Sequence, residues 1–327
     1  MTVTPVDPGM MKFYEELSAR TPPEAVNWPL AEQRRVWDDV CRAFRAPHPP
    51  GLTADDLDID GVKVRLFRPQ GGGLKPGVIY FHGGGWVLGS CETHDDMCAE
   101  MAAAAGAVVV LVDYRLAPEY RHPAQFEDAH TILAWMRKEG SKYGIDSARI
   151  VGAGDSAGGQ MTASLALSLR DRGMKQLKGQ VLIYPVLGGD MDTASYRRNA
   201  EAPCLTRADM KFYLEAFLGP HNNSNWRDPY AVPLMAASFE KLPPAFIAVA
   251  EHDPLMDDGV MFHERLRSAG VASQLRREPA LAHSYMRARH VSGPAMEGFK
   301  AITAALRAFA HEGKMVSAAA RENQTAL

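Results

Sequence analysis

Short apolar runs alternate with amphipathic stretches from about residue 55 to residue 310. The apolar run at 107–114 is continuous, which is typical of a strand buried on both faces of a parallel sheet. The stretch at 126–143 repeats its apolar residues at helical spacing and is expected to turn Ala129, Ile132, Leu133 and Met136 inward. Regular alternation of strand and helix predicts an α/β fold with a mostly parallel central sheet flanked by helices.

The same patterns place the remaining elements of this fold. Expected strands lie at 57–59 and 62–67, which form a hairpin around Asp60-Gly61, and at 78–81, 181–185, 245–250 and 271–277. Expected helices lie at 97–105, 160–169, 207–218, 259–268 and 296–310. A capping box at Thr93-His94-Asp95-Asp96 is expected to open the first of these helices, and Thr206 to cap the third.

Two segments depart from this rhythm. Residues 1–50 show helical spacing at 10–17 and 30–44, separated by prolines, and predict a helical cap before a catalytic domain at 51–315. Such an extension either packs on the core or covers a pocket. Residues 188–240 form a long insertion, which either helps to build a substrate pocket or decorates the surface. Residues 316–327 are expected to form a tail.

Composition excludes several classes of protein. The chain has 327 residues, of which 46% are hydrophobic, and a net charge of −3 with a pI near 6.4. Nothing therefore points to nucleic acid or an anionic membrane as a partner. The four cysteines form no C-x-x-C pair, so we do not expect a zinc site. We expect free thiols in a cytoplasmic protein. We find neither a secretory signal nor a membrane span.

One strand-to-helix junction carries candidate chemistry. It reads Gly154-Asp155-Ser156-Ala157-Gly158 and follows a short apolar run. The motif G-x-S-x-G predicts a strained turn that lifts a nucleophilic serine off the end of a sheet. The alternative is a glycine-rich turn with an ordinary surface serine, and the rest of the chain decides between them.

A second glycine cluster, His82-Gly83-Gly84-Gly85-Trp86, follows the strand at 78–81. Glycines at the end of a strand let backbone N–H groups point outward, and an acyl-transfer enzyme needs such donors for the oxyanion of its intermediate. A phosphate-binding loop is the alternative, but neither of its glycine spacings is present. We expect His82 to brace this loop.

A serine nucleophile needs a histidine base and a carboxylate that orients it. In chain order after Ser156, Asp253 lies in the loop after the strand at 245–250, and His283 in the loop after the strand at 271–277. Each role has competitors: Glu251, Asp257 and Asp258 for the acid, His252 and His290 for the base.

The three motifs His82–Trp86, Tyr114-Arg115-Leu116-Ala117-Pro118-Glu119 and Gly154–Gly159, with Asp253-Pro254-Leu255, together resemble the hormone-sensitive-lipase family of esterases, the bacterial H-G-G-G class. The resemblance covers about residues 57–310 and implies an α/β-hydrolase fold with an N-terminal helical cap. It implies that Ser156 is the nucleophile, Asp253 the acid and His283 the base. The backbone N–H groups of Gly83, Gly84 and Ala157 would form the oxyanion hole.

A carboxylesterase is therefore the leading hypothesis, with no metal or organic cofactor and with short- to medium-chain acyl esters as substrates. Amide hydrolysis stays open, because both reactions pass through a tetrahedral oxyanion. A small-molecule receptor of the gibberellin-receptor kind lacks the catalytic histidine, so His283 argues against it. The family usually reads His-Gly-Phe where this chain has His283-Ser284-Tyr285. The resemblance also implies a homodimer paired through the outer strand at 271–277.

Overall fold

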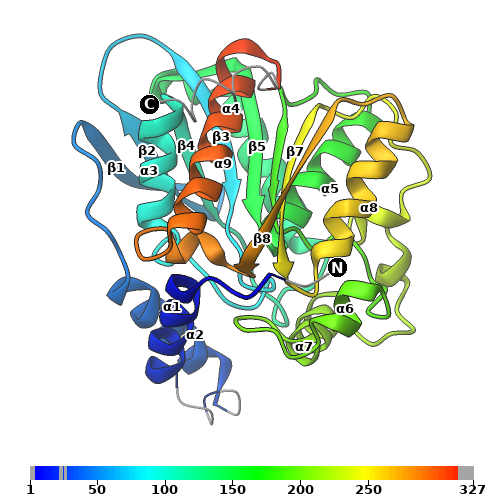
Figure 1. Cartoon of the computed structure of the whole chain (residues 1–327). Coiled ribbons are helices and arrows are strands. Elements are labelled where there is room, and N and C mark those ends of the chain that lie inside the picture. Colours follow the sequence, from blue (N-terminus) through cyan, green and yellow to red (C-terminus); the bar gives the residue numbers. More distant parts are fainter. Residues whose placement is uncertain (1–3, 22–24, 26–27, 316–327) are drawn as a thin grey trace.

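The computed structural model describes residues 4–21, 25 and 28–315, and its centre is an eight-stranded sheet (Figure 1). The strands lie in the order β1-β2-β4-β3-β5-β6-β7-β8. Their bounds are β1 Leu52–Ile59, β2 Val62–Pro69, β3 Lys75–Phe81, β4 Val108–Asp113, β5 Ile145–Asp155, β6 Gln180–Ile183, β7 Ala245–His252 and β8 Ser273–Ala282. Only the pairs β1–β2 and β2–β4 are antiparallel, which confirms the predicted mostly parallel α/β sheet.

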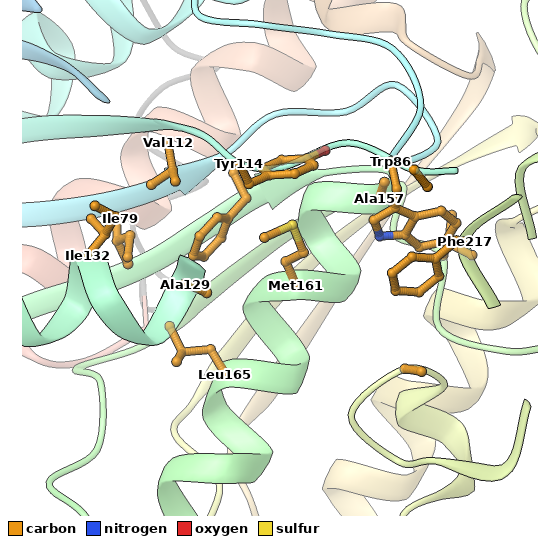
Figure 2. Close-up of a cluster of buried hydrophobic side chains, with 14 of the residues drawn as sticks. Ile79, Trp86, Val112, Tyr114, Ala129, Ile132, Ala157, Met161, Leu165 and Phe217 are labelled. Atoms are coloured by element: carbon orange, nitrogen blue, oxygen red, sulfur yellow. The ribbon is translucent and has the colours of Figure 1, made fainter. Parts of the chain in front are cut away.

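The apolar runs are explained by helices on both faces of this sheet. In β4, Val109 and Leu111 belong to the cluster that packs under α3 (Asp95–Ala105) and α9 (Gly293–Glu312). Alternate residues of the same strand join the opposite cluster under α4 (Ala124–Lys138) and α5 (Ala157–Asp171). Figure 2 shows part of that second cluster, where Met161 and Leu165 of α5 lie beside α4. The helix α8 (Met256–Ser268) covers β6 and β7 on the same side as α5.

Some predicted boundaries differ from the structure. The hairpin forms as expected around Asp60 and Gly61, and the box at Thr206 forms with Asp209. The capping box at Thr93 is wrong: His94 is the residue before α3, and no side chain caps this helix. The reason is local, because the Thr93 hydroxyl donates to Ser90 O and accepts from Ser90 N instead. The stretch at 126–143 also divides, with α4 ending at Lys138 before a 3₁₀ turn at Gly140–Tyr143.

Four helices lie at the carboxyl ends of the parallel strands (Figure 1). They are α1 (Pro8–Arg20) and α2 (Leu30–Ala43) from the N-terminal segment, and α6 (Ala194–Arg198) and α7 (Arg207–Leu218) from the insertion. Arg34 of α2 fastens this layer to the core. Its guanidinium donates to Val87 O at 2.8 Å and to Ala117 O at 2.9 Å, and binds both carboxylate oxygens of Glu119. The expected tail at 316–327 lies outside the described residues, and none of the described helices could cross a membrane.

Candidate active site

The predicted strand, turn and helix around Ser156 are present. β5 ends at Asp155, Ser156 has φ 55° and ψ −118°, and α5 begins at Ala157. The flanking glycines are required by close backbone packing. A Cβ atom on Gly158 would lie 1.8 Å from Phe81 O, and one on Gly154 would lie 2.3 Å from Gly158 O. The strained conformation of Ser156 is therefore fixed by the packing of β3 against the start of α5.

Ser156, His283 and Asp253 are hydrogen-bonded in series. The distance from Ser156 Oγ to His283 Nε2 is 3.0 Å, and the distance from His283 Nδ1 to Asp253 Oδ2 is 2.7 Å. An ionised carboxylate only accepts hydrogen bonds, so His283 Nδ1–H donates to Asp253 and Nε2 is left to accept from the serine hydroxyl. All three residues are buried, with exposed fractions of 6%, 4% and 0% in the order Ser156, His283, Asp253. Water is largely excluded from this chain of bonds.

The acid loop is held by contacts that the sequence did not reveal. Leu255 N–H donates to Asp253 Oδ1 at 2.8 Å. Asn199, in the insertion, donates from its side-chain amide to Asp253 O at 3.0 Å and to Glu251 O at 2.9 Å. Asn199 lies within the insertion at 188–240, and no local sequence signal links it to a loop more than 50 residues away.

The competing acids and bases are engaged elsewhere. Asp257 accepts from Ser195 N, and Asp258 from the backbone N–H groups of Leu187 and Gly188. Burial raises the pKa of Asp258 to about 7. The remaining competitors contact surface or cap groups: Glu251 with Arg198, His252 with Thr4 O, and His290 with Glu100.

The histidine loop accommodates Ser284 and Tyr285 in different ways. Ser284 has φ 62°, a left-handed conformation that favours glycine and costs a serine about 1 kcal/mol. Tyr285 is fully buried, and its ring meets Tyr184 edge-on with centroids 5.2 Å apart. Tyr184 in turn lies 4.7 Å from the His283 ring. Tyr285 therefore supports His283 through Tyr184, whose ring lies between the two.

The glycine loop is attached to the residue that precedes the serine. Gly83 N–H donates to Asp155 Oδ1 at 3.0 Å, and Tyr80 OH donates to the same oxygen at 2.9 Å. Because Gly83 N–H is already used, it is not available to an oxyanion, and the prediction that included Gly83 needs correction. Gly84 and Gly85 follow with φ 125° and 60°.

His82 braces this loop, as expected. Its ring stacks on Tyr114 with centroids 4.2 Å apart, and Tyr114 OH donates to His82 O at 2.8 Å. Burial lowers the pKa of His82 to about 3, so the ring is neutral at physiological pH. Burial alone would raise the pKa of Asp155, but His94, once it is protonated at the low pH where this carboxyl titrates, and the Arg287 guanidinium hold the pKa well below its usual range. A buried carboxylate thus anchors the loop.

Residues of α7, in the insertion, lie directly over the glycine loop. A Cβ atom on Gly85 would lie 2.3 Å from the ring of Tyr213 in α7, so this ring rests on the glycine backbone. Trp86 stacks on Phe217 of α7 with centroids 4.1 Å apart (Figure 2). A cavity of about 1090 Å³ lies elsewhere, between α8 and the segments at 188–193 and 221–235, and no triad or glycine-loop residue lines it.

Comparisons with known proteins identify the fold and the family of this chain. A family profile described as the alpha/beta hydrolase fold matches residues 78–287. Carboxylesterase NlhH of Mycobacterium tuberculosis is 40% identical over 89% of this chain and 86% of its own, and Esterase LipI of the same organism is 39% identical over 82% and 85%. Among solved structures, a thermostable esterase from Pseudomonas putida ECU1011 superposes with a TM-score of 0.87 at 28% identity, over 95% of this chain and 99% of its own.

The chain belongs to the α/β-hydrolase fold family, in its hormone-sensitive-lipase-like branch. It is an enzyme of the carboxylesterase class.

Proposed function

We propose that Ser156, His283 and Asp253 form the catalytic triad of this esterase. The observation that carries the proposal is the unbroken series of hydrogen bonds from Ser156 Oγ to Asp253 Oδ2 at the carboxyl ends of the strands. Ser156 attacks the ester carbonyl while His283 Nε2 takes its proton, and Asp253 stabilises the imidazolium. The proton then passes to the departing alcohol, and water releases the acid from the acyl-enzyme by the same route.

We propose further that Gly84, Gly85 and Ala157 supply the oxyanion donors, with Gly85 in place of the Gly83 of the sequence-based prediction. Two facts support this choice. Gly83 N–H is bound to Asp155, and no hydrogen bond from Gly84 N, Gly85 N or Ala157 N is found among the described residues. Ala157 is the first residue of α5, where the helix dipole also favours negative charge. Each donor of this kind contributes roughly 3 kcal/mol to the transition state.

The triad is tested by Ser156→Ala with p-nitrophenyl butyrate as the substrate. The variant should lose turnover by a factor on the order of 10⁴ or more, with its unfolding transition unchanged. Ser224→Ala, which alters an exposed serine of the insertion, is the matched control and should keep the parent rate. Residual turnover close to the parent in Ser156→Ala would refute the triad.

We infer that short- to medium-chain acyl esters are the substrates, because the ring of Tyr213 rests on Gly85 of the glycine loop and narrows the space above it. An ethyl acetate hydrolase of Pseudomonas putida, 34% identical over 78% of this chain and 81% of its own, acts by its name on a short ester. Turnover across p-nitrophenyl esters from acetate to palmitate tests this inference. A maximum at dodecanoate or beyond would contradict it, and p-nitroanilides of the same acids measure the competing amide hydrolysis.

A cytoplasmic location and a homodimer remain proposals that accompany this function. β8 forms one edge of the described sheet, where a second copy could add its own strand. The four cysteines are free, as expected of a protein in a reducing compartment.

A further inference from the structure

We propose that Arg287 is a positioning residue that holds the glycine loop in its working shape through Thr93 and His94. The inference rests on the proposed function, since it assigns a task within the same site. Arg287 lies four residues after His283, in the 3₁₀ turn Tyr285–Ala288. Its guanidinium joins the histidine loop to the segment before α3, which carries Thr93 and His94, and to α2.

The contacts of the guanidinium are unusual for an arginine. Its Nη1 donates to Thr93 O at 2.8 Å and lies 3.3 Å from Cys41 Sγ of α2. Its Nη2 lies 3.3 Å from His94 Nε2, and its Cζ lies 5.4 Å from the centroid of the Trp37 ring. Within the part of the chain that the structure describes, no carboxylate forms a salt bridge with it. Its charge therefore acts on its neighbours without being neutralised by direct contact.

The contacts around His94 favour one tautomer of the imidazole. Two donors, Gly83 N–H and Arg287 Nη2, each lie 3.3 Å from His94 Nε2, which favours a lone pair at this atom. The proton of neutral His94 is then on Nδ1, 2.8 Å from the Thr93 hydroxyl, whose own proton is free to reach Ser90 O at 2.9 Å.

This acceptor sits beside the anchor of the glycine loop. His94 Nε2 is 3.3 Å from Asp155 Oδ2 and 3.3 Å from Gly83 N, while Gly83 N–H donates to Asp155 Oδ1. A lone pair next to a carboxylate is repelled, and the guanidinium on its other side compensates for this repulsion. Neutral His94 leaves Asp155 to bind Gly83. A protonated His94 would carry a proton on Nε2, 3.3 Å from Gly83 N, so that two donors would face each other beside Asp155 and push the glycine loop away.

The charges around His94 decide which form is present. Burial lowers the pKa of His94 most, the Asp155 carboxylate raises it, and the Arg287 guanidinium lowers it. The groups that face His94 are Asp155 from β5, Arg287 from the histidine loop, Asp96 from α3, and His82 and Tyr80 at the end of β3. Loss of the guanidinium removes one of the two influences that keep the ring neutral.

The test replaces Arg287 by Gln and measures kcat, KM and the melting temperature from pH 5 to pH 9 with p-nitrophenyl butyrate. We expect kcat to fall about ten- to a hundredfold with little change in KM, because the misplaced donors act only in the transition state. We also expect the acid limb of the kcat profile to move up by about one pH unit, since His94 then protonates more readily.

Arg289→Gln is the matched control. Arg289 lies two residues further on and pairs directly with Asp96 and Glu100, without touching His94. Its loss should lower the melting temperature but leave kcat within about twofold and the acid limb in place. An unmoved acid limb in Arg287→Gln, or the same kcat profile in both variants, would overturn the proposal.

If Arg287→Gln does not fold, the same measurements on Arg287→Lys test the positioning role. A lysine keeps the charge but cannot hold Thr93 O and His94 Nε2 with a planar fork, so kcat should fall about threefold or more at an unchanged acid limb. A lysine variant with the parent kcat would exclude a positioning role. Ser156→Ala, measured in the same assays, distinguishes failure of the triad from failure of this inference. Turnover retained by Ser156→Ala would refute the proposed triad. Unchanged catalysis in the Arg287 variants would refute only the positioning role of Arg287.

Discussion

The two sides of the site are built by different physical means. On one side, the turn at Ser156 is fixed by backbone packing, with Gly158 pressed against Phe81 O and Gly154 against Gly158. On the other side, the acid and histidine loops are held by polar contacts and by the fit of side chains such as Asn199 and Tyr285. Steric fixing tolerates no added atom, whereas polar fixing is graded and depends on pH. The nucleophile side should therefore fail abruptly when altered, and the base side gradually.

The largest effect is expected from Gly158→Ala. The new methyl group would meet Phe81 O at 1.8 Å, so β3 and α5 would have to separate. We expect a loss of more than about 3 kcal/mol in the free energy of unfolding, together with loss of turnover. Urea unfolding and the butyrate assay measure both. Gly72→Ala is the control, because nothing lies within 4 Å of its added atom, and it should change stability by less than about 0.5 kcal/mol. Equal stability of Gly158→Ala and Gly72→Ala would contradict the view that backbone packing fixes the serine side of the site.

A smaller effect, confined to the base side, is expected from pH. Burial raises the pKa of Asp258 from 3.8 to about 7 in the folded protein. Between these values the unfolded chain releases the proton while the folded protein keeps it, so the contribution of Asp258 to stability falls as pH rises from about 4 to 7. Above pH 7 the loss is constant and at most about 4 kcal/mol, because one pKa unit corresponds to about 1.4 kcal/mol.

Asp258→Asn removes this titration. The difference in unfolding free energy between the variant and the parent should therefore grow in favour of the variant from pH 4 to pH 7 and then level off. Denaturant titrations at unit pH steps measure it, and a difference that stays constant across this range would show that the carboxylate is not perturbed.

The smallest effect is expected at Ser284. Glycine removes the cost of a left-handed serine but adds freedom to the unfolded chain, so Ser284→Gly should gain about 0.5 kcal/mol. Ser284→Val, which places a branched side chain at φ 62°, should lose about 1–2 kcal/mol. Thermal unfolding ranks the three proteins. A glycine variant less stable than the parent would mean that the serine hydroxyl contributes more than the backbone costs.

Most of the core was predictable because its signals are local. Runs of a few residues are enough to predict the strand at 107–114 and the junction at Ser156. The order of serine, acid and histidine follows from the ends of successive strands. Helix ends were less predictable, since the Thr93 hydroxyl has a choice of partners and binds Ser90 instead of capping α3. Sequence patterns do not show which of several hydrogen bonds a side chain makes.

Apart from the bracing role of His82, the supports of the site were not predictable. Asp155 binds Gly83 across 72 residues, and Arg287 meets His94 across 193. Such pairs leave no periodic pattern, because each partner looks ordinary in its own segment. The same reason explains the error at Gly83: the motif indicates that N–H groups are available, but only the folded chain shows that Asp155 has taken the first of them.

The Arg34 clamp has a consequence for protein engineering. The Arg34 side chain of α2 donates to two backbone carbonyls and one carboxylate of the core. One of these carbonyls is Val87 O, which follows the glycine loop. The backbone groups are present whatever their side chains are, so most of the joint on the core side does not depend on sequence. An exchangeable helical module would thus need an arginine at this place, together with an apolar face that replaces the contacts of Met10 and Phe13 with the core.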